Sequence, residues 1–208
     1  MSTYGDTRRV DEATVAYQPD SGLMAELSAL DEAIYAAVAS SSTPTLDEFF
    51  RRLSRISDKS VLWLGTAAVL AAFGGRTGRR AALNGVASVG LASASVNLGF
   101  KHIARRRRPD RGGVGVIDER HVPMPDSTSF PSGHSASAFA FAEGVSTAAP
   151  ALGVPIRLLA VAVAYSRVHT GVHYPGDVVA GSLIGITAGE IASRVVGVAV
   201  RPRHSTTS

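Results

Sequence analysis

The stretch AALNGVASVGLASASVNLGF, residues 81–100, decides the fold. It contains no Asp, Glu, Lys or Arg over its twenty positions. A helix of that length is roughly 30 Å long, which matches the hydrocarbon core of a bilayer. Gly, Ala and Ser fill eleven of the positions, and such small residues allow helices to pack closely in lipid. The stretch therefore predicts a transmembrane α-helix rather than a helix from the core of a soluble protein.

Four further runs with few charged residues lie on either side of this stretch. They cover residues 60–75, 135–156, 158–166 and 178–200. Glu143 is the charged residue of the second run, and Glu190 and Arg194 interrupt the last one. Together the five runs predict an all-α fold: an integral membrane bundle of five to six transmembrane helices, preceded by amphipathic helices at the N-terminus.

The uncertainty in the number of spans comes from the N-terminal region. Residues 23–41 and 45–60 both have the periodicity of amphipathic helices. The first of them carries Glu26, Asp31 and Glu32, which makes it a poor membrane span. If this helix lies flat, the chain has five spans and its N-terminus is outside; if it crosses, there are six spans and both termini are cytoplasmic.

The sequence divides into four parts. Residues 1–20 are polar and predict a flexible tail, with no apolar run of the kind that a cleavable signal peptide requires. Residues 21–59 hold the amphipathic helices, which include the possible first membrane helix. Residues 60–200 form the predicted membrane domain, and residues 201–208 form a basic C-terminal tail.

The distribution of Arg and Lys predicts how the helices are oriented. If each run crosses once, three basic segments share one side, which should be cytoplasmic: residues 74–81, 150–157 and 201–203. The loops at residues 101–132 and 167–176 then share the opposite side. That side carries KHIARRRRPDR, residues 101–111, against the usual charge bias. A basic cluster in that position predicts an anionic ligand.

Lys101 and Arg108 are the first candidate ligands of that anion. They are seven residues apart, so both fit on one face at the end of a helix that Pro109 terminates. Two fixed cations suit a phosphoryl group. The alternative is a basic run, Arg105–Arg108, that only binds the headgroups of anionic lipids. The run has no interleaved aromatic residues, so we expect no nucleic-acid partner.

The segment FPSGH, residues 130–134, opens the next hydrophobic helix. We expect Ser129 to cap this helix and Pro131 to lie in its first turn. Ser132 and Gly133 would then present backbone N–H groups to an anion, with His134 beside it. The alternative is a helix start whose histidine merely faces the lipid headgroups.

The segment SRVHTGVHYPGD, residues 166–177, joins the last two hydrophobic runs. Asp177 falls in the first turn after Pro175, where it could orient His173 through one ring nitrogen and leave the other free to attack. Arg167 would add a third cation. We expect His169 to lie in the loop or behind the reacting groups. The alternative is that His173 and Asp177 only cap a helix.

The three motifs, Lys-x6-Arg-Pro, Pro-Ser-Gly-His and Ser-Arg-x5-His-x3-Asp, resemble the type 2 phosphatidic acid phosphatase family, which shares its site with vanadium haloperoxidases. The resemblance covers residues 60–194. It implies that His173 is a nucleophile that forms a phosphohistidine and that Asp177 orients it. It also implies that His134 protonates the leaving alkoxide and then activates water.

The resemblance further implies which residues hold the phosphate: Lys101, Arg108, Ser132, Gly133 and Arg167. It implies no metal and no cofactor, because these cations supply the electrostatic stabilisation. The chain has no Cys, and no carboxylate cluster has metal-ligand spacing near the motifs.

The expected function is that of a membrane lipid phosphatase in a bacterial plasma membrane, with its site on the extracytoplasmic face. Phosphatidic acid, phosphatidylglycerol phosphate and polyprenyl phosphates or diphosphates all fit the motifs, and the loop at residues 112–128 is expected to shape the choice. A non-enzymatic module that binds anionic lipids and a vanadate-dependent haloperoxidase are the alternatives.

Overall fold

The computed structural model describes residues 22–101 and 106–199, and within these ranges the regular elements are all helical. This confirms the prediction of an all-α fold. The predicted tails, residues 1–20 and 201–208, lie outside the described residues, as does Arg105 of the basic run.

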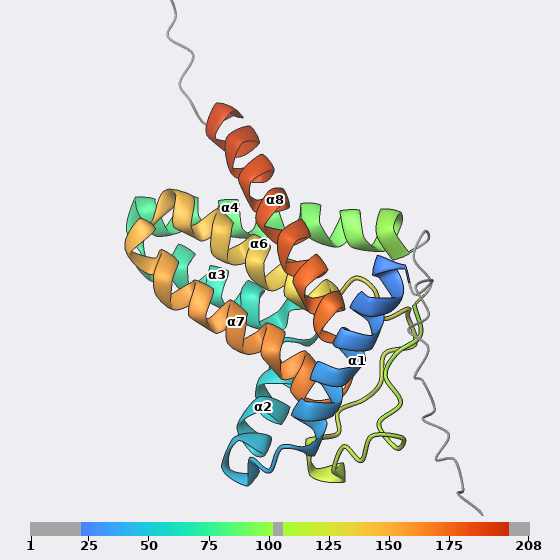
Figure 1. The fold of residues 1–208 in the computed structure, drawn as a ribbon. Helices are drawn as coiled ribbons and strands as arrows, with labels where there is room; N and C mark the ends of the chain where they lie inside the picture. The colour runs from blue at the N-terminus through green and yellow to red at the C-terminus, as the bar shows by residue number, and fades with distance from the viewer. Residues whose placement is uncertain (1–21, 102–105, 200–208) are drawn as a thin grey trace, which may run out of the picture.

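The five predicted hydrophobic helices are all present. They are α3 (Val61–Phe73), α4 (Gly75–Ala94) with the π-helical turn η2 (Ser95–Phe100), α6 (Gly133–Ala148), α7 (Gly153–His169) and α8 (Pro175–Ala199). Figure 1 shows α3, α4, α6 and α7 running beside one another, while α8 crosses α4 and α6 at a steep angle. Short 3-10 turns lie at Asp58–Ser60 (η1), Asp118–Arg120 (η3) and Pro150–Leu152 (η4).

The connection between α3 and α4 differs from the basic loop expected at residues 74–81. Gly74 alone separates the two helices, and its neighbour Gly75 has a φ of 58°. The helices approach so closely that a Cβ on Gly78 would lie 2.2 Å from the carbonyl oxygen of Leu70. The glycines therefore let the chain reverse without a loop, and the arginines of this segment belong to the first turns of α4.

Helix α6 lies at the centre of the bundle, between α4 and α8. Small residues permit this position: a Cβ on Gly144 would lie 2.7 Å from the carbonyl oxygen of Asn84, and one on Gly185 would lie 2.3 Å from that of Ala136. The larger apolar side chains fill the space toward α3, where the ring centroids of Trp63 and Phe141 are 5.3 Å apart. The Gly, Ala and Ser content noted in the sequence is thus the basis of close helix packing.

Within the described part of the chain, three helices are long and apolar enough to cross a membrane: Gly75–Phe100, Pro150–His169 and Pro175–Gly197. The pair α2 and α3, which bends by 63°, would be a fourth. Helix α6 has 16 residues and measures roughly 24 Å, less than a bilayer core of roughly 30 Å. Length and hydropathy thus support three or four spans, and the total of five to six stays a prediction.

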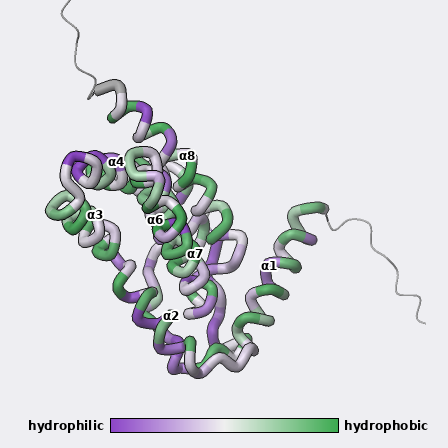
Figure 2. Tube along the Cα trace, turned by 90° about the vertical axis from the view of Figure 1, so that its left-hand side faces the viewer, coloured by the Kyte–Doolittle hydropathy of each residue, from purple (hydrophilic) through white to green (hydrophobic). Residues whose placement is uncertain are grey.

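The two N-terminal helices are α1 (Leu23–Ser40) and α2 (Pro44–Ile56). Helix α1 lies beside the start of α8 (Figure 1), and hydrophobic and hydrophilic residues alternate along it (Figure 2). Asp31 and Tyr35 face the protein and are buried, whereas Glu32 is exposed and Leu27 and Leu30 are at least half exposed. Asp31 makes an ion pair with Arg106, so α1 packs against the folded body.

Candidate active site

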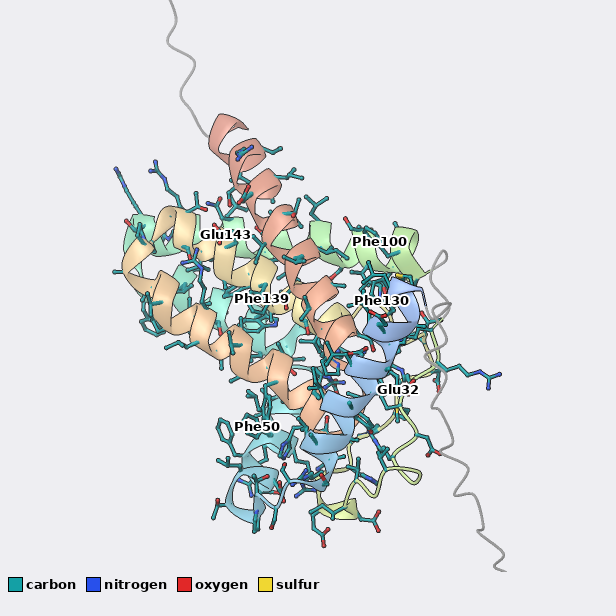
Figure 3. The ribbon with its side chains drawn as sticks, viewed as in Figure 1. Glu32, Phe50, Phe100, Phe130, Phe139 and Glu143 are labelled. Atoms are coloured by element: carbon teal, nitrogen blue, oxygen red, sulfur yellow. The ribbon has the colours of Figure 1, made fainter. Side chains whose placement is uncertain are left out.

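The three motifs meet at one end of the bundle. Figure 3 shows Phe100 and Phe130, which adjoin the first two motifs, at that end, with Glu143 farther back along α6. A cavity of about 310 Å³ opens there between η1, the end of α4 with η2, the loop at residues 106–131, α6 and the turn that precedes α8. Five of the predicted site residues line it: Lys101, Arg108, Gly133, His134 and His173.

Arg108 lies across the cavity, where loop carbonyl groups hold its guanidinium. Its Nε donates to the carbonyl oxygen of Ser127 at 2.9 Å, and its Nη1 donates to that of Val172 at 2.7 Å. The same Nη1 is 3.2 Å from Nε2 of His173. Lys101 Nζ donates to the Ser127 hydroxyl at 3.1 Å. The two cations of the first motif thus converge on one place. They do not share the face of a helix that ends at Pro109, as expected, because residues 106–110 are irregular.

The electrostatics of this wall favour an anion. Burial lowers the pKa of Lys101, and the positive charge of Arg108 adds to the effect. Burial likewise lowers the pKa of Arg108, although the carboxylate of Asp177 opposes it. Both shifts mean that the positive charges of Lys101 and Arg108 lack sufficient negative charge nearby. A phosphoryl group bound between the two side chains would supply it.

His173 follows α7 and is almost fully buried. Its Nδ1 is 3.5 Å from Asp177 Oδ2 and 3.4 Å from the Ser129 hydroxyl, while its Nε2 faces Arg108 and the cavity. Burial is the main cause that lowers the pKa of His173 to about 3; Arg108 acts in the same direction, and Asp177 opposes it. The imidazole is therefore neutral at neutral pH, with Nε2 positioned as the free nitrogen.

Asp177 is fully buried at the start of α8 and is held from several sides. It accepts hydrogen bonds from the backbone N–H of Tyr174 at 2.9 Å and from the Ser129 hydroxyl. The sequence had suggested that Ser129 caps α6, and this prediction is wrong. The cap is Ser132, whose hydroxyl accepts from the backbone N–H of Ser135 at 3.4 Å. Ser129 instead occupies the space between the carboxylate and the imidazole.

Two predicted phosphate ligands lie outside the cavity wall. Ser132 is fully buried, and its hydroxyl is engaged inside the first turn of α6. Arg167 is 1% exposed, and its Nη1 donates to the Ser54 carbonyl oxygen at 3.1 Å and to the Ser54 hydroxyl at 2.5 Å. The structure thus brings the third cation behind the cavity, where it contacts the end of α2.

His169 lies in the last turn of α7, away from the cavity. Its Nε2 is 2.9 Å from Asp47 Oδ1, which also accepts from Nε of Arg120 at 2.9 Å. Arg120 in turn donates to the carbonyl oxygen of Val38 at 3.0 Å. This buried cluster connects the loop at residues 106–129 to α1, α2 and α7. His169 therefore stabilises the position of this loop and does not line the cavity.

Two carboxylates at the site have no signal in the motifs. Asp31 Oδ2 is 2.6 Å from Arg106 Nη1, which is also 3.2 Å from Asp177 Oδ1. Asp58 Oδ1 is 2.8 Å from His134 Nε2. Neither pair could be found from local spacing, because 75 and 76 residues separate the partners in the chain.

Among residues 22–101 and 106–199, no group of three or more His, Asp or Glu side chains is placed to hold a metal ion. The arrangement that is present consists of cations, two histidines and a buried carboxylate. It can bind a phosphoryl group and present a neutral imidazole nitrogen to it.

Comparison with known proteins gives the same assignment. The model of the PAP2 superfamily matches residues 81–201. Decaprenylphosphoryl-5-phosphoribose phosphatase of Mycobacterium tuberculosis H37Rv is 36% identical over 154 residues, which are 74% of this chain and 82% of the relative. The protein of the same description from Mycolicibacterium smegmatis is 36% identical over 135 residues, 63% of this chain and 68% of the relative.

Two solved structures have the same fold. Aquifex aeolicus LpxE superposes with a TM-score of 0.63 at 26% identity, over 79% of this chain and 95% of that protein. The transmembrane PAP2 type phosphatidylglycerolphosphate phosphatase of Bacillus subtilis gives a TM-score of 0.64 at 25% identity, over 86% and 89%. The family model matches more than half of the chain, the relatives are 36% identical and the helical architecture is shared. The chain is therefore an integral membrane protein of the PAP2 superfamily.

Proposed function

We propose that the protein is a metal-independent phosphatase that removes phosphate from a membrane lipid through a phosphohistidine on His173. One observation carries this proposal: the buried imidazole of His173 has Asp177 beside Nδ1 and the cationic cavity at Nε2. A neutral nitrogen nucleophile beside Lys101 and Arg108 is what attack on a phosphate ester requires.

The reaction has two steps. In the first, the lone pair of His173 Nε2 attacks phosphorus and the bond to the lipid oxygen breaks. His134 gives a proton to that oxygen, while Asp177 stabilises the positive charge that develops on the His173 ring. Lys101 and Arg108 bind the phosphoryl oxygens throughout, and the backbone at Gly133 faces the same space.

In the second step, water attacks phosphorus and the bond to Nε2 breaks. His134, which is deprotonated after the first step, accepts the proton of that water. Inorganic phosphate leaves, and both histidines return to their starting states. Every proton is thus accounted for within the pair His134 and His173.

The metal-independent part of the proposal has a direct test. Phosphate release should continue in EDTA and should be inhibited by vanadate, which mimics five-coordinate phosphorus. Loss of activity in EDTA that Mg²⁺ restores would contradict it.

We further propose that the substrate is a polyprenyl-linked sugar phosphate. The relatives at 36% identity are named for such a compound. The cavity supports it, since hydroxyl and amide side chains of Ser93, Asn97 and Ser137 line it beyond the phosphate-binding cations. These groups suit the hydroxyls of a sugar between phosphate and lipid better than they suit a diacylglycerol.

An apolar groove supports a long hydrocarbon chain in the substrate. It is lined by the side chains of Ile56, Val61, Leu62 and Val69, with Gly65 and Thr66 between them. Residues 57–60 separate this groove from the cavity, and three of them line the cavity. The chain of a bound lipid would lie in the groove while its phosphate reaches His173.

Purified protein should be tested for phosphate release from four lipids: phosphatidic acid, phosphatidylglycerol phosphate, a polyprenyl diphosphate and a polyprenyl-linked 5-phosphosugar. We expect the highest kcat/KM for the last of these. A preference for phosphatidic acid would overturn the substrate assignment, and hydrolysis of none would overturn the function.

We also propose that the cavity opens on the extracytoplasmic face. The support is the charge of the opposite end, where Arg76, Arg79 and Arg80 of α4 are exposed.

A further inference from the structure

The turn η1 (Asp58–Ser60) forms one wall of the cavity, although it lies outside the residues that match the PAP2 model. Lys59 and Ser60 line the cavity, and both have left-handed backbone conformations, with φ of 51° and 59°. Such conformations are uncommon for residues other than glycine, and they gather where function requires a particular backbone path. Here they accompany the 63° bend between α2 and α3.

This bend brings the carboxylate of Asp58 to the histidine of the second motif. Asp58 Oδ1 is 2.8 Å from His134 Nε2 and 3.7 Å from Arg167 Nη1. The His134 side chain is 21% exposed and that of Asp58 is 45% exposed, so the contact is half-buried at the cavity rim. A bond between nitrogen and oxygen at this distance is a charge-assisted hydrogen bond when the ring is protonated.

We propose that Asp58 is the positioning residue of the general acid His134. The carboxylate accepts a hydrogen bond from Nε2–H, which leaves Nδ1 as the nitrogen that gives its proton to the leaving oxygen and later takes one from water. The role rests on the proposed phosphatase reaction, and it mirrors on His134 what Asp177 does for His173.

The surroundings of His134 explain why such a partner is needed. Burial disfavours a proton on this ring, and the positive charges of Arg167 and Arg108 repel one. Asp58 is the carboxylate that opposes them. The imidazolium must form before each proton donation, and without the charge of Asp58 it has no counter-ion. The neutral imidazole needs no counter-ion, so the loss destabilises only the protonated form.

The leaving group provides a readout that a purely structural role would not change. An alkoxide needs a proton as it departs from a lipid phosphate, and general acid catalysis contributes about 10²–10⁴-fold. The p-nitrophenolate of p-nitrophenyl phosphate departs without one. Formation of the phosphoenzyme should therefore depend on Asp58 with the first substrate and not with the second.

The experiment measures the rate of phosphoenzyme formation in the first turnover of the full chain, with a polyprenyl-linked 5-phosphosugar and with p-nitrophenyl phosphate. Asp58→Asn keeps the volume and removes the charge. We expect its rate with the lipid to fall by roughly 10–100-fold and its rate with the aryl ester to change by less than about threefold. Asp58→Glu should recover most of the lost rate.

A control variant and a count of active sites separate this effect from general damage to the protein. Glu190→Gln is the control for the loss of one carboxylate charge, because the side chain of Glu190 is 52% exposed on α8 and lines no part of the cavity. The amplitude of the p-nitrophenolate burst counts the competent sites, so a misfolded fraction lowers the amplitude and not the rate per site.

A double variant supplies the last arm. Asp58→Asn combined with His134→Ala should be no slower with the lipid than His134→Ala alone, since Asp58 acts through that ring. Additive losses, equal losses with both substrates or a wild-type rate in Asp58→Asn would each overturn the inference. If the wild-type protein forms no phosphoenzyme with either substrate, the proposed function has failed instead.

Discussion

Replacing Asp177 by Asn should lower kcat by about two to three orders of magnitude and leave KM nearly unchanged. When His173 Nε2 bonds to phosphorus, the ring becomes positively charged, and the nearest carboxylate oxygen is 3.5 Å from Nδ1. Coulomb's law gives about 5 kcal/mol for that pair at an effective dielectric constant of about 20. This corresponds to roughly 10³-fold in rate.

The expected loss is smaller than the full Coulomb term because Asp177 already faces a second cation. Arg106 Nη1 is 3.2 Å from Asp177 Oδ1, and the Asp177→Asn change would leave that guanidinium with the Asp31 carboxylate alone. KM should be nearly unchanged in Asp177→Asn, since Asp177 lies behind the cavity wall and does not face the substrate.

The assay is steady-state phosphate release, with the melting temperature measured in the same detergent to confirm that the variant is folded. Glu190→Gln serves again as the exposed control. A loss in kcat below about tenfold, or a loss that appears only in KM, would refute the role given to Asp177.

Other parts of the structure give three more predictions. Gly65→Leu adds a side chain where a Cβ meets no atom within 4 Å, and it should raise KM for a long-chain lipid phosphate but not for p-nitrophenyl phosphate. Gly90→Leu on α4, where a Cβ is equally unobstructed, should change neither KM. Equal effects of the two variants would argue against the groove as the lipid-binding site. Because the folded protein holds the pKa of His173 at about 3, below the ordinary value of about 6.5, its contribution to stability is present above that ordinary value and is lost as the pH falls toward the folded one. The melting temperature should therefore drop more between about pH 7 and about pH 4 in the wild type than in His173→Gln, and parallel curves would contradict this. A Cys at Gly113 should react with an impermeant thiol reagent in intact cells and one at Thr77 should not, both positions being exposed; the reverse pattern would place the site on the cytoplasmic side.

The fold could be predicted from the sequence because hydrophobic runs need no partner to be recognised. Residues 81–100 have no charged side chain, and they form α4 and η2 in the structure. The predicted connection after α3 was wrong, since the turn depends on how closely Gly74 and Gly78 approach the preceding helix. Such contacts between helices leave no periodic pattern in the chain.

The site could be predicted where the residues lie at helix ends of fixed spacing. Lys101, His134 and His173 lie at or next to helix ends and line one cavity, whereas Arg108 reaches it from the irregular segment at residues 106–110. Arg167 was assigned to the phosphate by the same reasoning, but its guanidinium contacts the end of α2. That contact depends on the bend between α2 and α3, which is a property of tertiary packing.

The carboxylates that hold the site were missed for a related reason. Asp31 and Asp58 belong to an N-terminal region that reads as two amphipathic helices with ordinary polar faces. Their partners are Arg106 and His134, far away in sequence. A polar face directed at solvent and one directed at an active site have the same pattern, so only the folded structure separates them.

The central claim is that His173 carries the phosphoryl group, and a quench experiment with ³²P-labelled lipid phosphate tests it most directly. We expect a label that is acid-labile and base-stable, that maps to His173 and that is absent from the His173→Ala protein. A label that persists in His173→Ala, or turnover by that variant at the wild-type rate, would show that His173 does not carry the phosphoryl group.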